Sequence, residues 1–122
     1  MQRLFVVLLA AAFFCACGGR PSIGPDGSTV GGQCNASRDC DSTGICTTDS
    51  NFSNGVVGMC TQQGCVNDAG CPAGTACVFI GINICAVTCG TLQDCSGFGR
   101  GWTCKGISRP GGQPDAMVCR LP

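Results

Sequence analysis

The chain has 122 residues, enough for about one domain, and its 14 cysteines give a density typical of disulfide scaffolds. It contains no His, Glu or Tyr, which excludes Ser-His-acid and Cys-His catalysis and removes the commonest neutral metal ligand. Seven basic residues balance seven acidic ones, so the chain has no net positive charge that would favour binding to nucleic acid or to an anionic membrane surface. The acids are scattered Asp residues that form no acid-base pair, and we expect no enzyme activity.

The first predicted element is an export signal. One basic residue, Arg3, precedes an unbroken apolar run over residues 4–14, and small residues follow it. Even counted to Cys17, this run would span about 21 Å as a helix, which is short of the ~30 Å hydrocarbon core of a membrane. A charged start, a short apolar stretch and small residues at its end are typical of a secretory signal peptide. We therefore expect residues 1–16 to be absent from the folded protein.

Two cleavage schemes fit the end of the signal. The tetrapeptide Phe14-Cys15-Ala16-Cys17 resembles the lipobox of bacterial lipoproteins, although its first two residues depart from the usual ones. The resemblance implies that Cys17 becomes the new N-terminus and carries fatty acyl chains such as palmitate. Gly18 after the cysteine then implies an outer-membrane location. In the alternative scheme, signal peptidase cuts after Gly18 and releases a secreted chain.

Residues 17–33 are predicted to be the lipidated cysteine and a flexible tether. Residues 18–33 hold six glycines and two prolines without a periodic apolar pattern, which is typical of a random coil. A coil of that length spans about 20–24 Å, a suitable distance between an acylated cysteine and a compact domain. This favours lipidation, and the other interpretation is the disordered N-terminus of a secreted protein.

Twelve cysteines follow the tether in three groups of four, and we expect them to form disulfides. Five residues separate the first two cysteines of every group. Five also separate the second and third cysteines in the first two groups, and eight in the last. The predicted modules are residues 34–60, 65–85 and 89–119. Their cysteines are, in order, Cys34, Cys40, Cys46 and Cys60; Cys65, Cys71, Cys77 and Cys85; Cys89, Cys95, Cys104 and Cys119.

The predicted fold class is small and disulfide-rich, with three short β-hairpin and loop modules and little core. Large aliphatic and phenyl residues occupy only 18 of the 106 positions from Cys17 onward, so cross-links must supply stability that burial does not. Each module has a turn signal between its third and fourth cysteines, at Asn54-Gly55, Gly81 and Pro110-Gly111-Gly112. No segment beyond the signal has helical periodicity, so we expect no helix there.

The cysteine spacing, with Asp or Gly before each second cysteine, resembles the cysteine-rich repeats of myxobacterial-type surface lipoproteins. It is also similar to EGF-like repeats and to the N-terminal cysteine-rich motif of Dickkopf proteins. Spacing alone leaves the pairing open, because four cysteines allow three pairings. The resemblance to EGF-like repeats implies that the first cysteine pairs with the third and the second with the fourth.

Metal sites and cofactors are not expected. No C-x2-C pair and no His follows the tether, which argues against zinc, and an exported compartment favours disulfides. The segment Asp39-Cys40-Asp41-Ser42-Thr43-Gly44 matches the first half of a calcium loop. Its twelfth position is Ser50 where an acid is needed, so we favour turn residues over a calcium site.

One aromatic and basic cluster is the candidate binding site, because such residues are common at binding hot spots. It consists of Phe98, Arg100, Trp102 and Lys105. The plainer interpretation is that Trp102 packs on a disulfide. Two glycosylation sequons begin at Asn35 and Asn51 and have meaning only in a eukaryotic source.

These patterns predict an exported, membrane-anchored lipoprotein of the outer membrane or cell surface, with a structural or binding role. Its expected partners are membrane lipid through the acylated N-terminus and an unidentified protein or glycan. The alternative is a freely secreted, extracellular inhibitor or toxin-like ligand that presents the insertion over residues 97–105 as an exposed loop.

Overall fold

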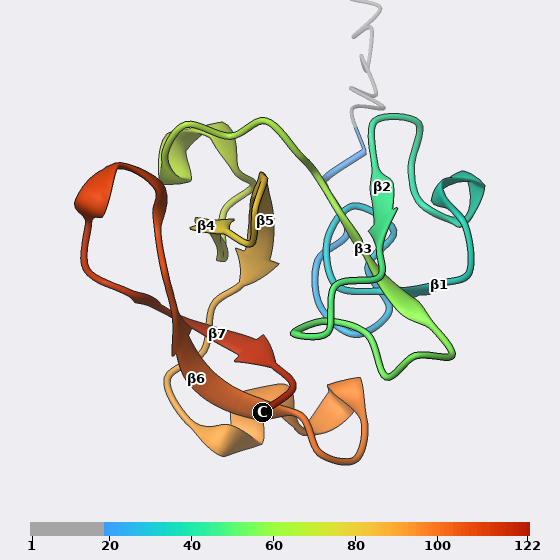
Figure 1. Ribbon diagram of the computed structural model, residues 1–122. Helices are drawn as coiled ribbons and strands as arrows, with labels where there is room; N and C mark the ends of the chain where they lie inside the picture. Colours follow the sequence, from blue (N-terminus) through green and yellow to red (C-terminus); the bar gives the residue numbers. More distant parts are fainter. Residues whose placement is uncertain (1–18) are drawn as a thin grey trace, which may run out of the picture.

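The computed structural model describes residues 19–122, so the predicted signal peptide and Cys17 lie outside the described residues. The fold of these residues consists of three small antiparallel sheets, as Figure 1 shows. Each sheet carries cysteines of one of the three groups. Within residues 19–122 there is no helix with the length and apolarity needed to cross a membrane. The predicted small, disulfide-rich fold is confirmed.

The seven strands of residues 19–122 are two to five residues long, and each pairs antiparallel with a neighbour. The first module has a three-stranded sheet in the order β1-β3-β2, and the other two modules are single hairpins. The strands are β1 (Gln33–Cys34), β2 (Ile45–Thr47), β3 (Gly58–Thr61), β4 (Thr75–Phe79), β5 (Asn83–Val87), β6 (Thr103–Ile107) and β7 (Ala116–Arg120).

Short 3-10 segments are the helical structure of residues 19–122, which contain no α-helix. In every module, one such segment begins between the first and second cysteines, and that of the third module continues past Cys95. A fourth lies in the turn of the last hairpin. The segments are η1 (Ser37–Asp39), η2 (Asp68–Gly70), η3 (Leu92–Phe98) and η4 (Pro110–Gly112).

The predicted disulfide pairing is confirmed in all three modules. The third and fourth cysteines of each module lie directly opposite each other on the two strands of its hairpin. Each bonds to one of the first two cysteines of its module, so the segment before the hairpin is fastened to both strands. The bridges are Cys34–Cys46, Cys40–Cys60, Cys65–Cys77, Cys71–Cys85, Cys89–Cys104 and Cys95–Cys119.

The hairpin of β4 and β5 is buried on both faces, which makes it the central element. Val78 and Ile84 are directly opposite each other and belong to the larger core cluster, together with Val118 of β7. Side chains alternate along a strand, so Cys77 and Cys85 point to the other face, where they pack with Val30. The small core therefore joins the modules.

The prediction of a flexible tether is wrong for residues 22–32. Val30 is fully buried, and the Gly31 N–H donates to the Cys60 carbonyl oxygen (2.8 Å), while the Cys60 N–H donates to the Gly32 carbonyl oxygen (2.8 Å). The glycines are explained by close approach: a Cβ on Gly31 would lie 2.4 Å from the Gly24 carbonyl oxygen. The glycines of this segment therefore allow tight backbone packing, whereas their abundance in the sequence predicts a flexible coil.

Candidate functional site

Three aromatic rings meet where the first module contacts the third. Phe98, at the end of η3, is buried and stacks on Trp102 with ring centroids 5.0 Å apart and planes inclined by 29°. Phe52, from the loop between β2 and β3, is buried against the same Trp102 at 6.5 Å in a tilted arrangement. Such pairs stabilise beyond the area that they bury. The plainer interpretation of Trp102 as a packing residue therefore holds, but its partners are aromatic rings.

The insertion of the third module positions these rings. The bridge Cys95–Cys119 fastens η3 to β7, and the chain then turns through Gly99 and Gly101, with φ of 117° and 88°. Those values lie in the left-handed region that glycine adopts readily. The Trp102 N–H donates to the Gly99 carbonyl oxygen (3.4 Å), so Trp102 returns over Phe98 as β6 begins.

A cleft of about 310 Å³ lies beside this cluster, between the N-terminal segment, the loop of the first module and the insertion. Three of the predicted binding residues, Phe98, Arg100 and Trp102, line the cleft. The fourth, Lys105, is exposed on β6 and lies outside it. Its inclusion in the candidate site is therefore not supported by the geometry.

The cleft combines apolar ring surface with a single positive charge. Phe52 and Pro25 add apolar walls, Asn54 adds an amide, and Arg100 is the one charged residue among those that line the cleft in residues 19–122. This size is at the lower end of small-ligand pockets. The arrangement suits a flat or apolar group that stacks against the half-buried Trp102 and carries an anionic substituent that pairs with Arg100.

Phe52 is the residue that sequence reasoning missed. The sequence marks its neighbour Asn51 only as part of a glycosylation sequon, yet the Asn51 side chain is engaged in the fold. Its Nδ2 donates to Asp49 Oδ1 (2.7 Å), and its Oδ1 accepts a hydrogen bond from the Arg120 guanidinium. These contacts join the first module to the end of β7 and hold Phe52 against Trp102.

Two aspartates before second cysteines perform the same task in different modules. Asp39 Oδ2 accepts from the N–H groups of Asn35 (2.8 Å) and Ala36 (3.0 Å), and these bonds lower the pKa of the Asp39 carboxyl. In the third module Asp94 accepts from two N–H groups in the same way, and its pKa is likewise lowered. Both carboxylates fix the loop that leads into a 3-10 segment.

The segment that resembles a calcium loop is a pair of turns, in which Asp39 and Gly44 are turn residues, as predicted. Asp41 Oδ2 accepts from the Thr29 hydroxyl (2.8 Å), and its Oδ1 accepts from the Thr43 N–H (3.1 Å). The bond from Thr29 is the largest cause of the lowered pKa of Asp41. A Cβ on Gly44 would lie 2.9 Å from the Cys40 Cβ, which explains the glycine.

The sulfur atoms of the bridges are close together within each module. In the first module the Sγ atoms of Cys34, Cys40 and Cys60 lie within 4.8 Å of one another, and the other modules repeat the arrangement. Each of these sulfurs is part of a disulfide and offers no thiolate to a metal. The clusters are therefore stacked bridges.

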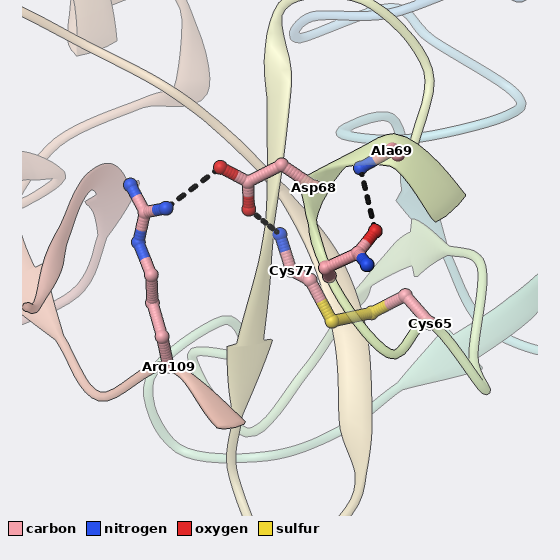
Figure 2. Close-up of polar contacts among 6 residues, drawn as sticks. Cys65, Asp68, Ala69, Cys77 and Arg109 are labelled. Atoms are coloured by element: carbon pink, nitrogen blue, oxygen red, sulfur yellow. Dashed lines mark hydrogen bonds and ion pairs between the residues drawn. A yellow bond between two sulfur atoms is a disulfide. The ribbon is translucent and has the colours of Figure 1, made fainter. Parts of the chain in front are cut away.

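An ion pair links the second and third modules. Arg109 Nη1 and Asp68 Oδ2 are 2.7 Å apart, and the other Asp68 oxygen accepts from the Cys77 N–H (2.9 Å), as Figure 2 shows. The position of Asp68 corresponds to Ser37 in the first module, whose hydroxyl accepts from the Cys46 N–H (3.1 Å). The first two repeats therefore share a side-chain bond to the third cysteine that the spacing of cysteines did not reveal; the third has Leu92 at this position.

No family model matches the chain, and neither the curated proteins nor the solved structures contain a detectable relative. The fold itself defines the class: a small cysteine-rich protein with six disulfides. Such bridges form and persist in oxidising compartments, so this is an exported protein.

Proposed function

We propose that the chain is an exported lipoprotein, anchored through acylated Cys17 to a bacterial outer membrane or cell surface, with a non-catalytic binding or structural role. The observation that carries the proposal is the pairing of all twelve cysteines from Cys34 onward. The fold needs no bond to Cys17, which stands at the modified position of the lipobox-like tetrapeptide. Acyl chains at Cys17 would provide a stable anchor.

The packed N-terminal segment alters the expected geometry of this anchor. The Ser22 hydroxyl is bonded to that of Ser28 (2.8 Å), so the fold begins at Ser22. Four residues, 18–21, then separate Cys17 from the folded part, and the five steps from Cys17 to Ser22 reach about 17 Å when fully extended. A lipoprotein of this kind would hold its modules close to the membrane surface.

The proposed binding surface is the cleft beside Trp102, and its ligand is an unidentified protein or glycan with an anionic group. The chain contains a single Trp, so the fluorescence of Trp102 reports on occupancy. We expect oligosaccharides of uronic acids, or peptides that end in an apolar residue and a free carboxylate, to shift this emission. Arg100→Gln should remove the shift, whereas Lys105→Gln, a matched control outside the cleft, should retain it. An equal loss in both variants would exclude the cleft as the site.

The anchoring is tested by expressing the full chain and Cys17→Ala in a Gram-negative host. We expect the unaltered chain to enter the detergent phase with an N-terminal mass that includes acyl chains. The variant should lack that mass and enter the aqueous phase. Equal partition of both into the aqueous phase would exclude lipidation.

The freely secreted protein is the second candidate, and the packing of residues 22–32 favours it because this removes the long tether that suited a lipid anchor. A mature N-terminus at unmodified Gly19 would identify this form. The insertion over residues 97–105 would present only part of itself to a partner, because Phe98 is buried and Trp102 is half-buried.

A further inference from the structure

Two large apolar side chains are exposed at one end of the second module. The side chain of Val66 lies between Cys65 and η2, and that of Ile82 lies in the turn between β4 and β5; these residues are 78% and 48% exposed. Both line one shallow hollow, together with Gln63 and Asn83. We call the surface formed by Val66 and Ile82 the apolar tip. Adjoining exposed apolar residues are characteristic of interaction sites.

The backbone holds the apolar tip in this exposed position. Asn83 Nδ2 donates to the Cys65 carbonyl oxygen (2.8 Å), and the Gly64 N–H donates to the Asn83 carbonyl oxygen (3.0 Å). The bridge Cys65–Cys77 closes the same corner. These bonds fasten the segment that carries Val66 to the start of β5, next to Ile82, so neither side chain is free to turn inward.

The apolar tip lies at the end of the molecule where the described chain begins. Gln62 shares a hollow with Gly19 and Arg20, and the next residue, Gln63, shares the hollow of the apolar tip. Figure 1 shows the blue start of the chain and the start of β5 toward the upper end, whereas η3 lies at the opposite end. Cys17 is two residues before Gly19, so an anchor there would face the membrane with this end.

The charges around the apolar tip do not oppose such a contact. Asp68, two residues after Val66, is in the ion pair with Arg109 (2.7 Å), which Figure 2 shows. The exposed Arg20, three residues after Cys17 in the sequence, lines the hollow that it shares with Gln62. Its long side chain is suited to the headgroup region of a bilayer.

We infer that the apolar tip inserts into the headgroup and acyl boundary of the membrane that holds Cys17, as a second attachment besides the lipid. The inference rests on the proposed function for the position of the anchor. A linker of about 17 Å keeps the tip within reach of the bilayer. Burial of Val66 and Ile82 there would strengthen binding to a membrane and orient the cleft beside Trp102 away from the contact.

The test uses one acyl chain in place of the native anchor, because a single myristoyl chain binds membranes only marginally and makes a second contribution measurable. Residues 19–122 contain every strand and all six disulfides, so a chain that starts at myristoylated Gly18 keeps each described contact. Its binding to phosphatidylcholine vesicles is measured by sedimentation. The double variant Val66→Asn, Ile82→Asn is compared with Leu92→Asn, since Leu92 is 56% exposed in η3 at the other end.

We expect the double variant to bind vesicles at least about tenfold more weakly than the unaltered chain, and Leu92→Asn to bind within about twofold of it. A mass increase of about 12 on reduction verifies that all six bridges of each variant have formed. Equal vesicle binding by the double variant and the unaltered chain would overturn the inference. The inference would also be overturned if the unaltered chain self-associated without vesicles and the double variant did not, because the tip would then contact a second copy.

The proposed function stands or fails by a separate measurement. Myristate is placed on Gly18 in the vesicle experiment, so the result does not depend on whether cells acylate Cys17. The N-terminal mass of the protein purified from cells decides that question. Suppose that the double variant loses vesicle binding and that the native N-terminus proves to be unacylated. These two results together would refute the lipid anchor but not the membrane affinity of the tip.

Discussion

The second and third modules have the same disulfide pairing and different surroundings. In both, two bridges fasten the segment that holds a 3-10 turn to a hairpin of two five-residue strands. The hairpin of the second module is buried on both faces and presents its exposed apolar residues at one end. The third module has three more residues between its second and third cysteines, and the rings of Phe98 and Trp102 there contact Phe52 of the first module.

The difference shows which residues determine each level of structure. The cysteines establish the hairpin and loop within a module, because their bridges do not leave it. Contacts between modules come from residues in the stretches that vary, such as Val78, Phe52 and the pair of Asp68 with Arg109. A common cysteine pattern therefore specifies units, and the intervening residues specify how the units assemble.

Complete reduction has the largest expected effect, because it removes the feature that the two modules share. Each of the six bridges contributes about 2–4 kcal/mol and the apolar core is small, so we expect the reduced chain to unfold in every module. The measurement is the dispersion of amide signals in NMR spectra before and after reduction. Dispersed signals that persist from β4 and β5 would show that the central hairpin folds through burial alone.

Substitution of Ile84 should separate the central hairpin from the others. Ile84 has no exposed surface, so Ile84→Ala should lower the free energy of unfolding by about 2–5 kcal/mol through the cavity that it leaves. The matched control is Ile82→Ala in the same hairpin, where the exposed side chain should cost within about 0.5 kcal/mol. Denaturant unfolding of both variants measures the difference. Similar losses would contradict the central position of this hairpin.

Trp102→Ala should weaken the contact between the first and third modules by about 2 kcal/mol, less than a fully buried Trp would cost, because Trp102 is half-buried. Hydrogen exchange of the amides around Phe52 should accelerate, while exchange in β4 and β5 should change little. Phe79→Ala, which removes a ring that is 49% exposed, is the control. Uniform acceleration throughout the chain would mean that the modules do not open separately.

The smallest expected effect is on the loss of stability at low pH. The two N–H groups that bond Asp94 lower its folded pKa below the unfolded value of about 3.9, so this contribution is present above that pH and is lost as the pH falls through the folded pKa. Asp94→Asn should therefore make the decline of the melting temperature between pH 6 and pH 2 shallower.

The second module provides an internal control for the acid effect, because Gly70 occupies the position of Asp94. In a pH titration followed by NMR, the Gly90 and Thr91 amide signals should shift with Asp94 and cease to shift in Asp94→Asn. The Val66 amide, which corresponds to that of Gly90, should not change between the two proteins. A change at Val66 would indicate coupling between the modules.

Prediction from the sequence succeeded where covalent spacing controls the structure. The three modules, their hairpins and the pairing of cysteines followed from repeated gaps, from turn residues such as Asn54-Gly55 and from a family resemblance. The packed segment over residues 22–32 was missed because glycine allows both a free coil and a close approach, and composition does not distinguish them. Phe52 was missed because its role depends on Trp102, which is distant in the sequence.

The separation of the bridges into residues 34–60, 65–85 and 89–119 has a consequence for how the bonds are made. A chain exported from its N-terminus presents all four cysteines of one module to the oxidant before the next module emerges, so order of arrival sorts cysteines between modules. Within a module the next cysteine to emerge is always the wrong partner, since Cys40 precedes Cys46, the partner of Cys34. A bond that forms between consecutive cysteines must therefore be replaced by disulfide exchange inside the module, whereas the order of export already separates the cysteines of different modules.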